Sequence, residues 1–200
     1  DTFSKEGYEG AVVLDPNPGI YIDEPVAVLD YGSLYPSSMI EMNLSHETIV
    51  TDEQYLGDDG GKKLNDMGYD YEDISYDIFK TIYGSTGNVK SKLKIGIKTV
   101  RFVQYRDGTK GLIPQILNYL LTARKTTRAK IKYKTVKLKN GDEYTGLYDK
   151  ENGIVKTHLD KWTFDISDVS EVKDTYGDFE KSVFDGEQLA YKLTANSTYG

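Results

Sequence analysis

The stretch DYGSLYPSS, Asp30 to Ser38, places a carboxylate between an apolar run and residues that favour a tight turn. The apolar run, residues 25–29, indicates a strand that is buried on both faces. Pro36 suits the first turn of a helix and pushes Tyr35 out of helical geometry. Mg²⁺ prefers one or two carboxylates together with phosphate oxygens, and amides at a helix start favour anions. Asp30 and the following turn could therefore hold a metal-bound triphosphate, although Asp30 taken alone also fits an ordinary turn residue.

A second group of candidate residues lies on the helix that is predicted to open at Pro114. One i, i+4 row of this helix begins apolar and continues with cations; its members are Ile116, Leu120, Arg124, Arg128 and Lys132. A helix that only covers a core keeps its apolar row along its whole length. Guanidinium groups form paired hydrogen bonds to phosphate oxygens. The row therefore predicts a phosphate-binding face, with a solvated helix end as the alternative.

The last predicted helix carries a third group. Lys192, Asn196 and Tyr199 are spaced i, i+4 and i+7, so they share one face. A cation, an amide and an aromatic ring in this order suit the phosphate, the sugar and the base of a nucleotide. An ordinary polar stripe is the alternative. The neighbouring Leu189 and Leu193 are expected to pack against the core.

The charge distribution supports a site for anions. The net charge of the 200 residues is −7, yet residues 88–139 contain fifteen Lys or Arg and one acid, Asp107. This basic block predicts either an anion-binding surface or a solvated helix face. The chain has no cysteine, which excludes disulfides, thiolate zinc sites and a cysteine nucleophile. No apolar run approaches the length needed to span a bilayer, so we expect no membrane partner.

The remaining patterns indicate a mixture of strands and helices. Strands are predicted at residues 9–15, 26–30 and 98–105, and residues 51–87 are interpreted as a surface excursion with one helix. A hairpin is predicted around Asn140-Gly141 with a type I′ turn, which forms a small β insertion between two helices. The last helix is expected to start near Asp185, which forms a capping-box pattern with Gln188.

These residues also resemble known motifs. DYGSLYPSS resembles the first palm motif of the family B DNA polymerases, D-x-x-S-L-Y-P-S, and KLTANSTYG, residues 192–200, matches their fingers motif, K-x-x-x-N-S-x-Y-G. LLTARKTTR, residues 120–128, resembles the basic fingers helix of that family. YEGAVVLDPNPGIY resembles the segment before the first motif, and DGTKGLIP resembles the start of the fingers. The five matches are in the right order and span nearly the whole chain, and they are most similar to delta-like polymerases of eukaryotes and large DNA viruses.

The resemblance implies a role for each matching residue. Asp30 would be one of two aspartates that hold both catalytic Mg²⁺ ions, with help from the backbone carbonyl of Tyr31. The amides of Ser33 and Leu34 would bind the triphosphate of a dNTP, and Tyr35 would stack under the sugar and exclude a 2′-hydroxyl. The groups implied to grip the phosphates, or to support that grip, are Arg124, Arg128, Lys192 and Asn196. Tyr199 would lie against the nascent base pair.

The resemblance also implies an architecture and a reaction. We expect an α+β fold: residues 1–110 as a partial palm with a mainly antiparallel sheet, and residues 111–200 as antiparallel fingers helices with a β insertion at about 135–180. The implied reaction is attack of a primer 3′-hydroxyl on the α-phosphate of a dNTP. The family usually has lysine where Arg128 stands, and its second metal-binding aspartate would lie beyond Gly200, so the 200 residues alone are expected to be inactive.

The implied partners are primer–template DNA and dNTPs. A sliding clamp or other replication factors would bind through regions outside this chain. The expected location is intracellular, in a host nucleus or at a cytoplasmic site of viral replication. Two other hypotheses remain from the residues themselves: a non-catalytic nucleic-acid-binding module that uses the basic block, and an acidic structural domain with no ligand.

Overall fold

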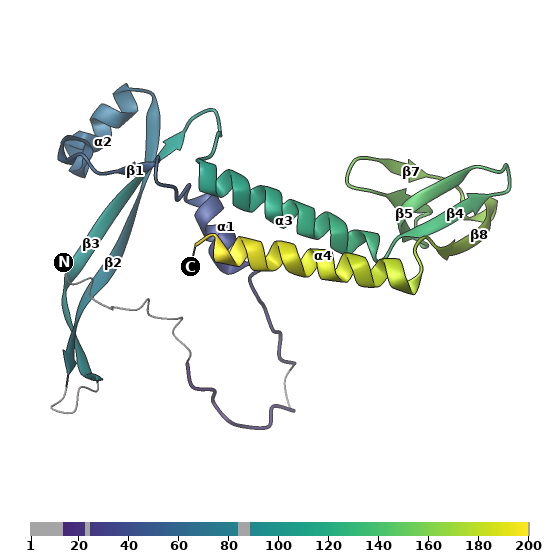
Figure 1. Cartoon of the computed structure of the whole chain (residues 1–200), viewed down its shortest axis with the longest axis horizontal. Coiled ribbons are helices and arrows are strands. Elements are labelled where there is room, and N and C mark those ends of the chain that lie inside the picture. The colour runs from purple at the N-terminus through teal and green to yellow at the C-terminus, as the bar shows by residue number, and fades with distance from the viewer. Residues whose placement is uncertain (1–13, 23–24, 84–88, 200) are drawn as a thin grey trace. The chain divides into compact units, whose positions relative to one another are not determined.

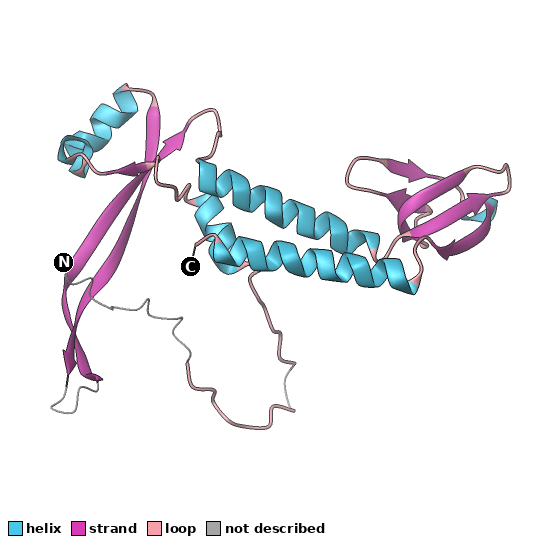
Figure 2. Cartoon of the chain, viewed as in Figure 1, coloured by secondary structure: helices cyan, strands magenta, loops and turns pink. Residues whose placement is uncertain are grey.

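The computed structural model describes residues 14–22, 25–83 and 89–199 (Figure 1). The chain divides into two units, residues 1–32 and 33–200, and each is described by itself. All helices and strands of the described residues lie in the second unit. They are α-helices and antiparallel strands (Figure 2), which confirms the predicted α+β class.

The first unit lacks the strand that the sequence predicted. Residues 14–22 and 25–32 adopt neither helix nor strand, and the side chains of Val26, Val28 and Leu29 are 68%, 87% and 95% exposed. The prediction of a buried strand at 26–30 is therefore wrong for this structure. An apolar run indicates a tendency to be buried, but a strand also needs a neighbour to pair with, and none of the described strands pairs with this segment. Most of the strand predicted at 9–15 lies outside the described residues.

An antiparallel three-stranded sheet lies near the start of the second unit, with the order β1-β3-β2. Its strands are β1 (Ile49–Val50), β2 (Tyr69–Tyr83) and β3 (Val89–Tyr105), and the short helices η1 (Glu53–Tyr55) and α2 (Gly57–Asp66) precede β2. The helix expected within residues 51–87 is confirmed as α2, and β2 has no buried residue, but the sequence interpretation missed that β2 is a strand paired with β3 along its whole length. The strand predicted at 98–105 is confirmed as the second half of β3.

Arg101 of β3 connects this sheet to the segment before it. The side chain is only 3% exposed. Its guanidinium donates to both carboxylate oxygens of Asp73 at 2.7 Å and to the carbonyl oxygens of Tyr55 and Gly57 at 2.8 Å. The guanidinium carbon also lies 3.8 Å from the centre of the Tyr71 ring. A buried charge is stable only when it is paired and hydrogen-bonded, and Arg101 meets both conditions.

The helical part of the second unit consists of α1 (Leu34–Glu41), α3 (Leu112–Lys130) and α4 (Asp178–Ser197). Helices α3 and α4 run side by side in opposite directions (Figure 1). Their shared core contains the buried residues Leu117, Leu120 and Ala195, and Met39 and Ile40 of α1 pack against it. Helix α1 is thus fixed to the base of the helical pair by apolar burial.

Two expectations about α4 are wrong. The helix starts at Asp178, not near Asp185, because the Glu180 carboxylate accepts a 2.6 Å hydrogen bond from the Gly177 N–H and closes the first turn. Leu189 and Leu193 do not pack; they are 47% and 61% exposed. The face of α4 that meets α3 is instead the one with Ala195.

A capping loop, residues 43–48, closes the N-terminus of α3. The N–H groups of Gly111, Leu112 and Ile113 donate to side chains of Asn43, Glu47 and Ser45 respectively. The Gly111 bond is 2.7 Å long and the Ile113 bond is 3.3 Å long. Since the first N–H groups of a helix have no acceptor within the helix, the loop supplies the acceptors that α3 lacks.

The β insertion is an antiparallel five-stranded sheet with the order β7-β6-β5-β4-β8. Its strands are β4 (Lys134–Leu138), β5 (Glu143–Asp149), β6 (Ile154–Lys156), β7 (Lys161–Thr163) and β8 (Val169–Asp174), and η2 (Ile166–Asp168) precedes β8. Its core is Val136, Leu138 and Val155, with four aromatic side chains packed around them. The hairpin at Asn140 is confirmed, but its turn is not type I′, since only Gly141 has a positive φ (97°).

The insertion is joined to α4 through one carboxylate. Asp174 at the end of β8 forms ion pairs with Lys134 of β4 and with Lys181 of α4, the latter at 2.7 Å. These two lysines lower the pKa of Asp174 from 3.8 to about 2.

Among the helices of the described residues, none is long and apolar enough to cross a membrane.

Candidate functional site

At the N-terminus of α1, no described side chain accepts a hydrogen bond from the first backbone N–H groups. Ser33, the residue before the helix, has φ 60° and ψ 60°, and its own side chain makes no capping hydrogen bond. Pro36 is buried in the first turn, which fixes this end of α1 in place. The amides at a helix start carry partial positive charge and favour anions. The predicted phosphate-binding amides of Ser33 and Leu34 therefore lie where an anion is chemically favoured.

Tyr35 of α1 stacks on Tyr199, which lies just after α4. The ring centres are 5.8 Å apart and the ring planes are inclined by 20°. The Tyr199 hydroxyl donates a 2.9 Å hydrogen bond to Oδ1 of Asn196. Burial and the neighbouring Tyr35 raise the pKa of Tyr199. The structure thus brings together three residues that the sequence predicted as a site, from segments far apart in the chain.

The predicted cations lie further along the helical pair. Arg124 is half-buried between α3 and α4, and its Nε donates to Oε1 of Gln188 at 3.2 Å. Gln188 lies one helical turn before Lys192, so Arg124 is level with the part of α4 that carries Lys192. Arg128, Lys192 and Asn196 have exposed side chains. Arg128 follows Arg124 by one turn along α3, in the direction of the β insertion.

Asp30 and Tyr31 belong to the first unit and are exposed. Within the described ranges, no group of three or more His, Cys, Asp or Glu side chains could hold a metal ion. Asp30 therefore supplies one carboxylate. Mg²⁺ commonly keeps one or two carboxylates and completes its shell with substrate phosphates and water. A single exposed carboxylate such as that of Asp30 matches the lower end of this range.

Part of the basic block is paired with acids. On β3 and directly after it, Arg101, Lys94 and Arg106 pair with acids of β2: Asp73, Asp77 and Asp70. In the insertion, Lys134 and Lys137 pair with acids of neighbouring strands. The acidic segments on either side of the block thus pair with at least five of its fifteen cations across the sheets. This pairing disfavours a nucleic-acid-binding module that relies on the whole block.

Gln188 and the capping loop are contributions that the sequence interpretation missed. Gln188 was assigned to a helix start, and its Nε2 does donate to Oδ1 of Asp185 at 3.1 Å, but both residues lie inside α4. Its position four residues before Lys192 was the signal that it shares a face with the candidate site. The capping loop had no comparable signal, because its acceptors lie more than sixty residues from the amides they bind.

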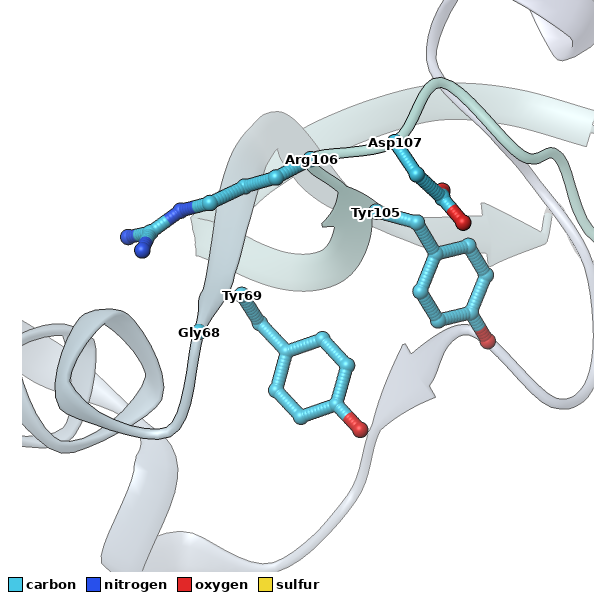
Figure 3. A pocket seen from close by; sticks show the side chains of 5 residues that line it. All are labelled: Gly68, Tyr69, Tyr105, Arg106 and Asp107. Carbon is cyan, nitrogen blue, oxygen red and sulfur yellow. The ribbon is translucent and has the colours of Figure 1, made fainter.

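A separate hollow lies at the end of the three-stranded sheet (Figure 3). Its volume is about 250 Å³, and it is lined by Gly68, Tyr69, Tyr105, Arg106 and Asp107. The two tyrosine rings meet edge to face with their centres 6.0 Å apart. None of the predicted site residues lines this hollow, so it is distinct from the Tyr35–Tyr199 region.

Comparison with known proteins identifies the class. The model of DNA polymerase family B matches residues 1–158. The DNA polymerase of Pyramimonas orientalis virus is 45% identical over 203 residues, which cover 100% of this chain and 16% of that protein. The DNA polymerase of Phaeocystis pouchetii virus is 33% identical over 207 residues, with 97% and 16% covered. The DNA polymerase delta catalytic subunit of Arabidopsis thaliana is 34% identical over 198 residues, with 98% and 12% covered.

This chain therefore belongs to the family B DNA polymerases, as its motifs indicated. Its relatives include both viral polymerases and eukaryotic delta catalytic subunits. The chain spans 16% of the length of the two viral relatives and 12% of the plant one. No solved structure matches it significantly.

Proposed function

We propose that this chain is the nucleotide-binding part of a DNA-directed DNA polymerase. The larger polymerase would transfer a nucleotide from a dNTP to a primer 3′-hydroxyl. The observation that carries the proposal is the meeting of Tyr35 with Tyr199 and Asn196 beside the uncapped N-terminus of α1. Family membership supports the reaction, and this geometry supports the location of the nucleotide.

The proposed triphosphate site has two sides. On one side are the backbone amides of Ser33 and Leu34 at the start of α1, which would bind phosphate oxygens through N–H groups. On the other side are the cations of the helical pair and a supporting amide: Arg124, Arg128, Lys192 and Asn196. During the reaction, a bond forms between the primer 3′-oxygen and the α-phosphorus, the bond to pyrophosphate breaks, and the 3′-hydroxyl loses its proton. The cations would stabilise the negative charge that develops on the leaving pyrophosphate.

The two stacked tyrosines would select the nucleotide. Tyr35 would lie under the deoxyribose, where its ring leaves no room for a 2′-hydroxyl. Tyr199 would lie against the nascent base pair, and its hydrogen bond to Asn196 would fix the direction of its hydroxyl. Because the rings already stack on each other, each limits the rotamers of the other. Sugar selection and base-pair contact would therefore be mechanically linked.

The proposed metal ligands are the Asp30 carboxylate and the Tyr31 carbonyl, with a second aspartate beyond this chain. We propose that two Mg²⁺ ions bind to these ligands. When bound, the ions would neutralise charge on the attacking and leaving oxygens. The role of Asp30 in this scheme is to supply a carboxylate ligand to the metal ions.

The proposed organisation assigns residues 1–110 to a partial palm and residues 111–200 to the fingers, with the β insertion at their tip. The proposed partners are primer–template DNA and dNTPs, together with a sliding clamp or other replication factors that bind elsewhere on the polymerase. The proposed place of action is inside the host cell, in the nucleus or at a cytoplasmic site of viral replication. These 200 residues alone are expected to be inactive.

Asp30→Ala in the full-length polymerase tests the reaction. We expect primer extension to be abolished because a metal ligand is lost, while DNA binding stays close to that of the unmodified enzyme. Asp15→Ala, which removes another exposed carboxylate of the same unit, is the control and should extend primers normally. Normal primer extension by the Asp30→Ala enzyme would refute the proposal.

Tyr35→Ala tests the selection of the sugar. We expect a clear rise in ribonucleotide incorporation relative to deoxyribonucleotide incorporation, because the ring that excludes the 2′-hydroxyl is removed. Tyr21→Ala, which removes an exposed tyrosine of the first unit, should leave the ratio unchanged. An unaltered ratio in the Tyr35→Ala enzyme would exclude Tyr35 as the sugar-selecting residue.

A further inference from the structure

Two side chains of α4 form a hydrogen-bonded chain that ends at Arg124 of α3. The Nε of Arg124 donates to Oε1 of Gln188 at 3.2 Å, and Nε2 of Gln188 donates to Oδ1 of Asp185 at 3.1 Å. We infer that Gln188 is a positioning residue for Arg124: it fixes the direction in which the guanidinium presents its remaining N–H groups to an anion. The inference rests on the proposed function, because it takes the anion to be the triphosphate of a dNTP.

The chemistry of the three groups fixes the orientation of the amide. An ionised carboxylate only accepts hydrogen bonds and a guanidinium only donates them. The Gln188 amide therefore turns its NH₂ group toward Asp185 and its oxygen toward Arg124. The guanidinium has five N–H donors, and the bond to Gln188 uses one of them. The other donors remain for phosphate oxygens, which a planar guanidinium binds in pairs.

A neutral partner suits this task better than a charged one. A carboxylate at position 188 would form an ion pair with Arg124 and would also repel a triphosphate. The amide of Gln188 orients the guanidinium and leaves its full positive charge for the substrate. A long side chain that is already held loses less rotamer freedom when the nucleotide binds.

Arg128 provides an internal comparison. It has the same side chain as Arg124 and lies on the same row of α3, one turn further on. Arg124 is half-buried against α4, whereas Arg128 is exposed. The structure thus holds one arginine of the row in place beforehand, and that arginine meets α4 at Gln188, one turn from Lys192. We expect Gln188 to affect nucleotide binding through Arg124 and not through Arg128.

A double-mutant cycle in the full-length polymerase tests this inference. Gln188→Met keeps the length of the side chain and removes the amide. We expect it to raise the KM for dNTP about 3- to 10-fold, the usual effect of one oriented hydrogen bond, with kcat nearly unchanged. Gln188→Glu should raise the KM further. In an Arg124→Ala background, Gln188→Met should have no additional effect, whereas in an Arg128→Ala background its full effect should persist.

The outcomes separate the inference from the proposed function. If Arg124→Ala leaves the KM for dNTP unchanged, Arg124 does not bind the triphosphate, and both the assignment and the inference fail. If Arg124→Ala raises the KM but Gln188→Met does not, the proposed function stands and the inference is overturned. If Gln188→Met raises the KM for dNTP equally in the presence and absence of Arg124, Gln188 has a general structural role, and the inference is also overturned.

Discussion

At the N-terminus of α3, three successive backbone N–H groups donate to side chains of the capping loop, whereas none of the side chains that the structure describes caps the N-terminus of α1. Both helices start with N–H groups that lack acceptors within the helix. In α3 the acceptors come from Asn43, Ser45 and Glu47, and Asn43 and Ser45 are buried. In α1 the preceding residue, Ser33, instead has a left-handed backbone (φ 60°), and Leu34 and Tyr35 are exposed.

The difference separates a structural helix start from one that can bind a ligand. A capped N-terminus has no donors left for an anion, so the start of α3 serves to fix the base of the helical pair. The open N-terminus of α1 keeps its donors, and it lies beside the stacked Tyr35 and Tyr199. Closing the start of α1 should therefore harm nucleotide binding, and opening the start of α3 should harm stability.

The largest effect is expected for Asn43→Leu. Asn43 is fully buried, and its side chain accepts from the Gly111 N–H at 2.7 Å and donates to the Val103 carbonyl at 2.8 Å. Its φ of 54° is also tolerated better by Asn than by Leu. We expect the local free energy of opening at the start of α3 to fall by about 2–4 kcal/mol. Hydrogen exchange of the amides in residues 111–117 measures this loss.

Two further variants show which part of Asn43 matters. Asn43→Gly keeps a backbone that tolerates positive φ but removes both hydrogen bonds, so it should be destabilised less than Asn43→Leu. Asn118→Leu changes an exposed asparagine of α3 and should have little effect. Unchanged exchange in the Asn43→Leu protein would contradict the structural role of the capping loop.

Gly111→Ala tests the close approach of the capping loop to α3. A Cβ at this position would lie 2.7 Å from Cβ of Ser45 and 2.9 Å from Oε1 of Glu47. We expect the local free energy of opening at the start of α3, measured by the same hydrogen exchange, to fall by about 1–3 kcal/mol, because the capping loop must move away. Gly96→Ala is the matched control, since a Cβ there meets nothing within 4 Å. Equal effects of the two substitutions would argue against tight contact.

Ser33→Asp places a negative charge at the open start of α1. We expect it to raise the KM for dNTP about 3- to 10-fold, which corresponds to about 1 kcal/mol, because the carboxylate competes with the triphosphate for the helix amides. Ser33→Asn has a similar size and tolerates the same backbone without the charge, so it should change the KM much less. Steady-state primer extension distinguishes the two variants. A similar KM for both would indicate that the start of α1 does not meet phosphate.

The smallest effect is expected for Glu47→Gln. The Ser45 hydroxyl and the Leu112 amide lower the pKa of Glu47 below its ordinary 4.5. Because its pKa is lowered in the folded state, the ionised Glu47 carboxylate stabilises the fold above about pH 4.5. This stabilisation is lost as the pH falls through the lowered pKa of the folded state. The variant should therefore unfold at a slightly lower temperature at pH 7, and the difference should narrow in acid. Glu53→Gln is the control with the same change of charge. If the difference in unfolding temperature between Glu47→Gln and the unmodified protein stays constant with pH, the mechanism is contradicted.

Local patterns in the sequence predicted where α1 and α3 begin. Pro36 and Pro114 lie in the first turns of these two helices. The sequence could not show that residues 26–30 remain unpaired in this structure, because pairing depends on another strand. It also could not show that acids of β2 neutralise cations of β3, since that depends on register across a hairpin.

The arrangement of the candidate residues was predictable within one helix and not across helices. Helical spacing places Lys192 and Asn196 on one face of α4, whereas Tyr199 lies just after the helix and reaches Asn196 through a hydrogen bond. The bond between Arg124 and Gln188 depends on how α3 and α4 pack, and the start of α4 at Asp178 depends on the contact between Glu180 and Gly177. Such contacts are tertiary, and propensity or periodicity does not contain them.

The double ion pair of Asp174 determines what acid does to the tip of the helical pair. This carboxylate holds a lysine from the first strand of the insertion and another from the first turn of α4. With its pKa lowered to about 2, it stays ionised well after ordinary carboxylates have been neutralised. Only strong acid, near pH 2, should therefore break these two ion pairs, so the electrostatic link between the insertion and α4 should outlast the neutralisation of ordinary carboxylates.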